Sequence, residues 1–411
     1  MTATDVRPPG AHLPGAHPPD VRPADGRRPD LVSRAARIGA EVAAPVADEV
    51  DRDARFPSEA VDVLRSEGLL GALIPVRLGG GGARVPDVAR AVTALGRHCS
   101  STSMIFAMHQ IQVACLVRHG ATPFFEEYLR RVAADGLLLA SATTEIGVGG
   151  DVRTSRCAVE RADGRFRLTK QAPVISYGQH ADAVLATARR TPESPASDQV
   201  LVVCRPPGLS LEATSGWDTL GFRGTCSLGF GLVAEGEDDL VMSVPYADIS
   251  SQTMLPVSHI VWGSVWLGVA GAAVERARRF VRAEARKQPG TTPPAAVHLA
   301  ELMAAHQQMT ELVEGSARRF DEMAADPDAS AGMGFAIAMN ALKVSASTMV
   351  IDIVGRAMAV CGMAAYRHDS PYSLGRLLRD AHGAPLMVNN DRILANNAQM
   401  LLVHRDRDDG L

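Results

Sequence analysis

The apolar residues change their period twice along this chain, and this change restricts the fold more than any other feature. Leu31, Ala35, Ile38 and Val42 fall on one face of a helix, and the helical spacing returns in long segments from Leu255 onward. Between these regions, short apolar or alternating runs separated by turn signals predict β-strands. Because helical and β segments are segregated, a doubly wound nucleotide-binding sheet is disfavoured. We therefore predict an α+β protein.

The pattern divides the chain into four parts. Residues 1–30 are rich in Pro, Gly, Ala, His and Asp and offer too little apolar surface to offset chain entropy, so we expect a disordered leader. Residues 31–136 predict an N-terminal helical domain, residues 137–252 a central β domain, and residues 253–411 a C-terminal helical bundle. Strands are expected at 137–142, 157–160, 166–169, 183–187 and 200–204. Long helices are expected at 255–286, 294–323, 334–359 and 393–403.

The composition is that of a soluble globular protein, with 46% hydrophobic and 21% charged residues and a net charge of −4. Nucleic-acid binders need clustered Lys and Arg, and no basic stripe occurs here, so we expect no nucleic-acid partner. The apolar run 104–117 contains polar residues and is too short for a bilayer, which predicts a buried helix and no membrane anchor. Six scattered cysteines without a signal segment favour reduced thiols in the cytoplasm. The dispersed histidines predict no metal site.

A glycine-rich loop follows the first expected strand. Residues 141–151 read Ser-Ala-Thr-Thr-Glu-Ile-Gly-Val-Gly-Gly-Asp. The segment is not a dinucleotide-binding fingerprint, because residues 151–154 lead toward strands and not into an apolar helix. Hydroxyl side chains and free backbone N–H groups at such a strand end can bind a flat heteroaromatic ring and a pyrophosphate. The alternative is a polar loop that caps a sheet.

Three further motifs accompany this loop in order along the chain. Phe56–Glu59 with Gly68–Gly71 precede it, and Gly221–Thr225 and Arg376–Ala381 follow it. Together the four motifs resemble the acyl-CoA dehydrogenase family over about residues 31–404. The resemblance implies an N-terminal helical domain, a central β-barrel-like domain and a C-terminal four-helix bundle. It also implies an FAD enzyme, a homotetramer or homodimer, whose isoalloxazine lies between the β domain and the bundle.

The resemblance further implies a set of cofactor contacts. Thr143 and Thr144 would contact the flavin ring, and Gly149 and Gly150 would lie near the pyrophosphate and the substrate thioester. Gly150 stands where the family commonly has Ser, so only its backbone N–H remains for binding.

A second flavin segment, usually Trp-Ile-Thr, corresponds to Val174, Ile175 and Ser176. Ser176 keeps the hydroxyl group, but the aromatic packing partner is replaced by Val174. The adenosine of a neighbouring subunit's cofactor is expected to contact Arg286, Gln288, Met358 and Gly362. Met358 stands where Gln is usual.

The expected catalytic carboxylate is missing. The family's Glu, which takes the α-proton of the acyl thioester, corresponds to Val388, and the position that some members use instead is about Ser258, beside His259. Asp391 and His382 are the candidates nearby for the catalytic base. Asp391 also suits the first turn of a helix, and His382 also suits a solvated or structural role.

The resemblance predicts an FAD-dependent oxidoreductase of biosynthetic metabolism that oxidises an acyl thioester carried on CoA or an acyl carrier protein. Its electron acceptor would be an electron-transfer flavoprotein or oxygen. A flavin-dependent monooxygenase on the same fold is the alternative, and a non-catalytic family member is a third possibility. Arg379 and Asp380 are interpreted as a structural ion pair. Candidate walls of the substrate pocket are Tyr177, Trp262, Trp266 and Met387.

Overall fold

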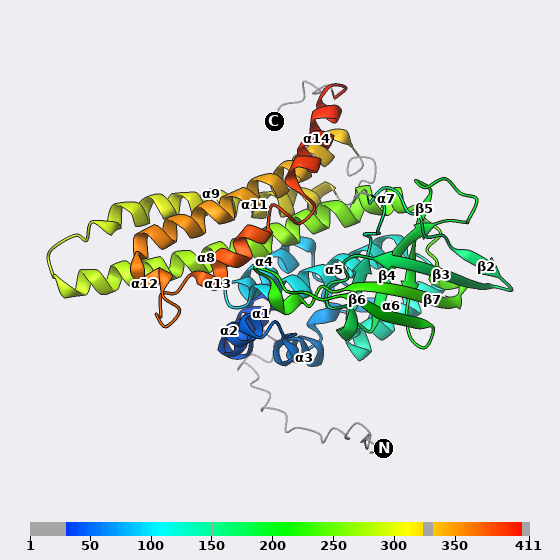
Figure 1. Cartoon of the computed structure of the whole chain (residues 1–411), viewed down its shortest axis with the longest axis horizontal. Helices are drawn as coiled ribbons and strands as arrows, with labels where there is room; N and C mark the ends of the chain where they lie inside the picture. The colour runs from blue at the N-terminus through cyan, green and yellow to red at the C-terminus, as the bar shows by residue number, and fades with distance from the viewer. Residues whose placement is uncertain (1–29, 149–151, 324–331, 405–411) are drawn as a thin grey trace, which may run out of the picture. The chain divides into compact units, whose positions relative to one another are not determined.

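Helices make up the N-terminal part of the chain in the computed structural model, which describes residues 30–148, 152–323 and 332–404 (Figure 1). The helices are α1 (Leu31–Ile38), α2 (Ala44–Arg52), α3 (Ser58–Ser66), α4 (Val85–Gly96), α5 (Ser100–His119) and α6 (Pro123–Asp135). The helical character expected for this part is therefore confirmed. Residues 1–29 of the expected leader, and also Gly149 and Gly150, lie outside the described residues.

Helix α5 is buried along most of its length, and its polar side chains bind backbone groups of neighbouring segments. Nδ1 of His109 accepts a hydrogen bond from Leu139 N at 3.0 Å, and its Nε2 lies 2.8 Å from Leu70 O. Because a carbonyl can only accept, Nε2 carries the proton, and burial lowers the pKa of this imidazole to about 4. Gln110 donates to the carbonyls of Leu69 and Leu70. These bonds explain the polar residues inside the apolar run and tie α5 to the first strand.

The middle of the chain forms two sheets. Their strands are β1 (Leu139–Ala142), β2 (Glu160–Ala162), β3 (Arg165–Ala172), β4 (Ala183–Arg189), β5 (Gln199–Cys204), β6 (Leu209–Ser215) and β7 (Gly229–Glu237). One sheet has the order β1-β4-β5, with β1 parallel to β4. The other is antiparallel and has the order β2-β3-β7-β6. The strand expected at 157–160 begins only at Glu160, and the sequence analysis did not predict β6 and β7.

Three long helices dominate the C-terminal part: α8 (Leu255–Lys287), α9 (Ala295–Met323) and α11 (Met333–Cys361) run side by side (Figure 1). The shorter helices α12 (Met363–Tyr366), α13 (Gly375–Gly383) and α14 (Asn390–Leu401) follow them. The expected long helices are thus confirmed. Helix α7 (Tyr246–Ile249) and a π turn (Ser250–Met254) lead directly into α8. Helical structure therefore begins before residue 253, where the C-terminal domain was expected to start.

Two helical segments are long and apolar enough to cross a membrane by length and composition alone, Tyr246–Lys287 and Met333–Cys361. The most apolar window of the first segment is 94% buried inside the protein, where α8 packs against α4, α5, α9 and α11. Such burial is typical of a core helix in a globular protein. In the second segment the corresponding window is 44% buried.

Candidate active site

A cavity of about 660 Å³ lies where the N-terminal helices, the β domain and the C-terminal helices meet. Its lining is mostly apolar, with hydroxyl groups on the β-domain side, and its volume is in the range of small-molecule sites. Its walls include Met104 and Met108 of α5, Thr143, Thr144, Val174 and Ser176 of the β domain, Ser258, His259 and Trp262 of α8, and His382, Met387 and Val388 in and after α13. The structure thus collects in one place residues that are distant in the sequence.

The hydroxyl groups expected at the flavin lie together in this cavity. Thr143 and Thr144 follow β1, and Oγ1 of Thr144 donates to Val174 O at 3.3 Å. Ser176 Oγ accepts a hydrogen bond from Ser227 Oγ at 2.8 Å, so its own proton remains available for a ligand. Ile175 is fully buried and is not among the residues that line the cavity, so its contact with the flavin stays a prediction.

A buried ion pair holds the loop that carries these threonines. Nζ of Lys170, on β3, lies 3.2 Å from Oε2 of Glu145, and their side chains are 0% and 6% exposed. The Glu145 carboxylate also accepts hydrogen bonds from Ser155 Oγ at 2.6 Å and from Cys157 N at 2.8 Å. Desolvation opposes ionisation, but the Ser155 hydrogen bond and the Lys170 charge lower the pKa of Glu145. Glu145 therefore has a structural role, which the sequence analysis did not identify.

The loop Gly221–Thr225 docks the β domain onto α13. Phe222 N donates to Oδ1 of Asp380 at 2.7 Å. A Cβ atom at Gly221 would lie 2.5 Å from Arg379 O and in equally close contact with the rest of that peptide group, which cannot move away. Only glycine permits this backbone approach, which explains the first residue of the motif.

Arg379 and Asp380 do not form the expected ion pair. Arg379 pairs with Asp51 of α2, and Asp380 accepts hydrogen bonds from Phe222 N and from Ser100 Oγ of α5. Burial raises the pKa of Asp380, although these bonds partly oppose the shift. Neighbouring residues on a helix point in different directions, so each side chain meets a different part of the protein.

The two candidate bases are placed differently. His382 lies on α13 and lines the cavity with an exposed side chain. Asp391 is exposed in the first turn of α14, where its backbone N–H donates to the Asn389 side chain at 2.8 Å. This is the helix-terminal role that the sequence offered as the alternative. The placement argues against Asp391 as the proton acceptor.

Val388, at the position of the usual carboxylate, lines the cavity with a backbone φ of 45°. This left-handed conformation is unfavourable for a β-branched residue, and a buried lysine holds it. Nζ of Lys343 donates to Val388 O at 3.2 Å and to Oδ1 of Asn390 at 2.7 Å. Burial lowers the pKa of Lys343 to about 8.

His259 is a cavity residue that the sequence analysis did not choose. Its side chain is 2% exposed, and Nδ1 lies 2.9 Å from Met339 O on α11. Burial lowers the pKa of this imidazole to about 4, the Met339 carbonyl opposes the shift, and the charge of Lys343 adds to it. Its position in an apolar helix resembles that of a core residue, and only the packing of α8 against α11 reveals its environment.

Two of the expected pocket walls lie elsewhere. Tyr177 is fully buried and donates to Leu139 O at 2.9 Å, and Trp266 is fully buried with Nζ of Lys343 5.8 Å from the centre of its ring. Trp262 and Met387 do line the cavity.

The residues expected at the adenosine lie at the other end of the bundle. Arg286 is in the last turn of α8 and Gln288 follows it, while Met358 and Gly362 lie at the end of α11. Arg286 is about 40 Å along α8 from His259, at 1.5 Å per residue. One chain therefore cannot bring these residues to the ligand that contacts Thr143, and their assignment requires a second subunit.

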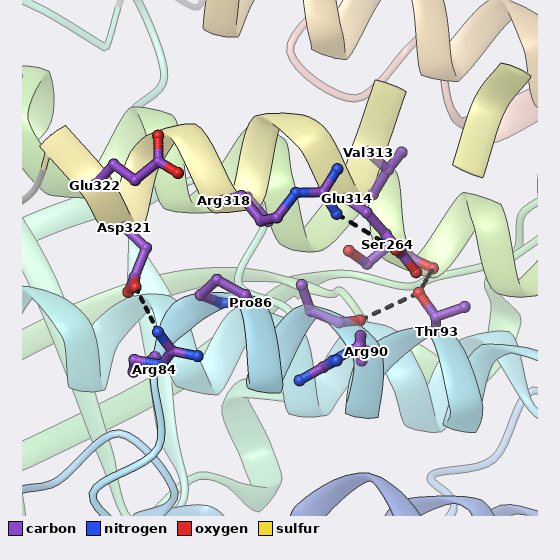
Figure 2. Close-up of a pocket in the computed structure, with 12 residues that line it drawn as sticks. Arg84, Pro86, Arg90, Thr93, Ser264, Val313, Glu314, Arg318, Asp321 and Glu322 are labelled. Atoms are coloured by element: carbon purple, nitrogen blue, oxygen red, sulfur yellow. Dashed lines mark hydrogen bonds and ion pairs between the residues drawn. The ribbon is translucent and has the colours of Figure 1, made fainter. Parts of the chain in front are cut away.

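A smaller pocket of about 260 Å³ lies between α4, α8 and α9 (Figure 2). Four of its charged side chains form two pairs: Arg84 lies 3.3 Å from Asp321, and Arg318 lies 3.7 Å from Glu314. Oγ1 of Thr93 donates to Ser264 O at 3.1 Å, and Figure 2 shows this bond on the side of the pocket where Arg318 and Glu314 lie. This arrangement joins three helices. Within residues 30–148, 152–323 and 332–404, no group of three or more His, Cys, Asp or Glu could hold a metal ion.

Comparison with known families gives two matches. Residues 29–160 match the acyl-CoA dehydrogenase N-terminal domain, and residues 250–397 match the acyl-CoA dehydrogenase C-terminal domain. Cyclohex-1-ene-1-carbonyl-CoA dehydrogenase of Geobacter metallireducens is 26% identical over 358 residues, which are 85% of this chain and 91% of that protein. The amino sugar nitrososynthase DnmZ of Streptomyces peucetius is 27% identical over 356 residues, which are 82% of this chain and 84% of that protein.

Solved structures share the fold. FMN-bound TdsC from Paenibacillus sp. A11-2 superimposes with a TM-score of 0.80 at 19% identity and covers 92% of this chain and 99% of its own. Butyryl-CoA dehydrogenase from Megasphaera elsdenii gives a TM-score of 0.74 at 19% identity and covers 90% of this chain and 97% of its own.

Proposed function

The chain belongs to the acyl-CoA dehydrogenase family, and on this premise we propose that it is a flavin-dependent oxidoreductase that oxidises an acyl thioester. The observation that carries the proposal is the cavity, which combines the hydroxyl groups of Thr143, Thr144 and Ser176 with a wall of apolar side chains. A flavin ring needs both, because its edge carries hydrogen-bonding atoms and its faces are apolar.

We assign the β-domain side of the cavity to the flavin. Thr143, Thr144 and the hydroxyl group of Ser176, whose hydrogen is free to donate, would bind the edge of the flavin ring. Trp217 and Phe222 would pack against the apolar surface of the ring. When bound, an oxidised flavin supplies an acceptor for a hydride. We propose FAD as the form bound, with Arg286 and Gln288 of a second subunit contacting its adenosine in a homotetramer or homodimer.

The acyl chain would occupy the opposite side of the cavity. Met104, Met108, Trp262 and Met387 provide an apolar surface there, and flexible methionines adapt to the shape of a ligand. The thioester carrier is CoA or an acyl carrier protein in this proposal, and the electron acceptor is an electron-transfer flavoprotein or oxygen. We also propose a cytoplasmic location, in keeping with six cysteines that all lie in the described residues as free thiols.

An anaerobic titration tests the proposal. The purified protein should show flavin absorbance, and a panel of saturated acyl-CoA and acyl-carrier-protein thioesters should include one that bleaches it. Acid release of the cofactor and its mass would distinguish FAD from FMN. A colourless protein that takes up neither flavin, or a flavoprotein that no thioester reduces, would contradict the dehydrogenase assignment.

A flavin-dependent monooxygenase is the second candidate, and two observations favour it. Val388 replaces the carboxylate that dehydrogenation normally uses, and one relative is a probable FMNH2-dependent monooxygenase, SfnC of Pseudomonas putida, 25% identical over 333 residues. In that case oxygen consumption should require a separate flavin reductase, and thioesters should not bleach the bound flavin. A protein that binds flavin but shows neither behaviour would be a non-catalytic family member.

A further inference from the structure

We propose that His259 is the catalytic base, and that its Nε2 takes the α-proton of the acyl thioester. The proposal rests on the function proposed above. It assigns the proton transfer to a residue that stands at neither of the two positions, Val388 and about Ser258, that correspond to the usual carboxylate.

The hydrogen bond of His259 determines which ring nitrogen carries the proton. Nδ1 faces Met339 O at 2.9 Å, and a carbonyl oxygen can only accept, so Nδ1 is the donor. A neutral imidazole has one N–H, which leaves a lone pair on Nε2. Among the described residues Nε2 has no hydrogen-bond partner, and the side chain lines the cavity. The structure thus presents a proton acceptor of fixed orientation to the proposed acyl site.

The surroundings keep this acceptor neutral and dry. The ring packs against Trp262, with a distance of 6.0 Å between the ring centroids. The charged neighbour is Lys343 on α11, whose Nζ donates to Val388 O and to Asn390. The titratable groups that line the cavity besides His259 are Tyr246 of α7 and Arg379 and His382 of α13. Burial among these groups leaves His259 uncharged at neutral pH, in the form that can accept a proton.

The other candidate residues are less suitable. The Ser258 hydroxyl donates to Met254 O within the helix, at the short distance of 2.5 Å, and serine is not a base at neutral pH. His382 has an exposed side chain, where water competes for its lone pair. Asp391 is exposed at the start of α14.

The proposed step balances as follows. The α-C–H bond breaks and its proton bonds to Nε2, which makes His259 an imidazolium. The β-hydrogen leaves with its electron pair as hydride, for which a bound oxidised flavin would supply the acceptor. A double bond forms between the α- and β-carbons. When the β-carbon has no hydrogen, the reaction stops at the thioester enolate, and return of a solvent-derived proton exchanges the α-hydrogen.

The exchange of the α-hydrogen measures the action of the base without any reduction of the flavin. The holoenzyme is incubated in D2O with 3,3-dimethylbutanoyl-CoA, which has α-hydrogens and no β-hydrogen, and deuterium uptake is followed by mass spectrometry. His259→Gln should lower the exchange rate at least about a hundredfold, the size of a general-base contribution. Its flavin content should stay at the wild-type level, because Gln can still donate to Met339 O. His382→Gln tests the competing candidate in the cavity, and His298→Gln, at an exposed position of α9, is the control that should retain exchange within a fewfold of wild type.

The results have distinct meanings. Wild-type exchange that persists in a folded, flavin-loaded His259→Gln protein overturns the base assignment, as does loss of exchange in His382→Gln alone or its absence in the wild type. The proposed function fails separately, by the absence of flavin or of bleaching.

If the variant does not fold, the wild-type pH profile still distinguishes the buried His259 from an exposed histidine as the base. A base that ionises near 4 gives a constant exchange rate from about pH 5.5 to 8. A rise centred near 6.5, the ordinary value of an exposed imidazole, contradicts the proposal.

Discussion

Replacing Lys170 by Met should lower the free energy of unfolding, because the loop that carries Thr143 and Thr144 loses the ion pair that holds it. The substitution keeps the length and apolar stem of the side chain but leaves the buried carboxylate of Glu145 without its cation. At 3.2 Å and an effective dielectric constant of about 20, the attraction that is lost is about 5 kcal/mol. Breaking buried pairs by removing one partner costs about 3–5 kcal/mol. Ser155 Oγ and Cys157 N still donate to the carboxylate. We therefore expect the free energy of unfolding to fall by about 3 kcal/mol, the lower end of this range.

Urea unfolding at pH 7 measures this change, and a double-mutant cycle with Glu145→Gln isolates the pair. The double variant should be more stable than Lys170→Met, because no uncompensated charge remains. Arg278→Met is the matched control: Arg278 pairs with Glu275 on the surface of α8 at 3.2 Å, and its loss should cost about 0–1 kcal/mol. A loss below about 1 kcal/mol for Lys170→Met would refute the reasoning.

The pH dependence gives a second check on the same pair. The pKa of Glu145 is lowered in the folded protein, so its contribution to stability is complete above its ordinary value of 4.5 and is lost as pH falls through the folded value. Removing Lys170 should raise the folded pKa and reduce the contribution, so the wild type and the variant should lose stability differently between pH 5 and 3. Identical curves would show that the lysine charge is not felt by the carboxylate.

Three further predictions concern residues that lie in the cavity wall or bind wall residues. Asp380→Ala should lower the free energy of unfolding by about 1–3 kcal/mol, because Phe222 N loses its acceptor. Asp380→Asn should lower it less. The raised pKa of Asp380 means that its ionisation costs stability as pH rises above 3.8 toward the folded value, and unfolding curves of Asp380→Asn should lack this decrease. Gly221→Ala should cost about 1–3 kcal/mol in urea unfolding through its clash with Arg379 O, and wild-type stability would contradict that contact. Burial lowers the pKa of Lys343 from 10.5 to about 8. The free energy of unfolding of the wild type should therefore rise by about 3 kcal/mol between pH 8 and 10.5, and Lys343→Met should lack this rise.

The long helices were predictable from the sequence because their apolar residues recur at helical spacing, whereas the short helices α7, α12 and α13 were not predicted. The strands β6 and β7 were not predicted, for different reasons. β6 is an edge strand with mostly exposed residues, so it carries little apolar signal. In β7, Phe230, Leu232 and Ala234 alternate as expected for a strand, but glycines occupy intervening positions and resemble turn signals. A test for period two across Gly229–Glu237 would have found it.

The site was predictable where the family motifs mark its residues. Thr143, Thr144 and Ser176 follow strand ends, and their grouping was expected from the motifs. Hydrogen bonds between residues that are distant in the sequence leave no local pattern. Lys343 donates to Val388 O in the segment after α13, and His259 donates to Met339 O, 80 residues away. Before the helices pack, nothing distinguishes these two side chains from other residues of an apolar helix.

The same pairings make the absent carboxylate intelligible. A Glu at position 388 would place its charge on a segment held by the Lys343 ammonium, which would lower the pKa of that carboxylate and weaken it as a base. His259 is neutral before the reaction and needs no counterion, although the charge of Lys343 lowers its pKa as well. Its pKa of about 4 gives it nearly the proton affinity of an ordinary Glu, about 4.3. The nearby ammonium then favours return of the proton to water. A neutral imidazole in the cavity wall therefore needs no ion pair with Lys343, whereas a carboxylate at position 388 would lie beside its charge.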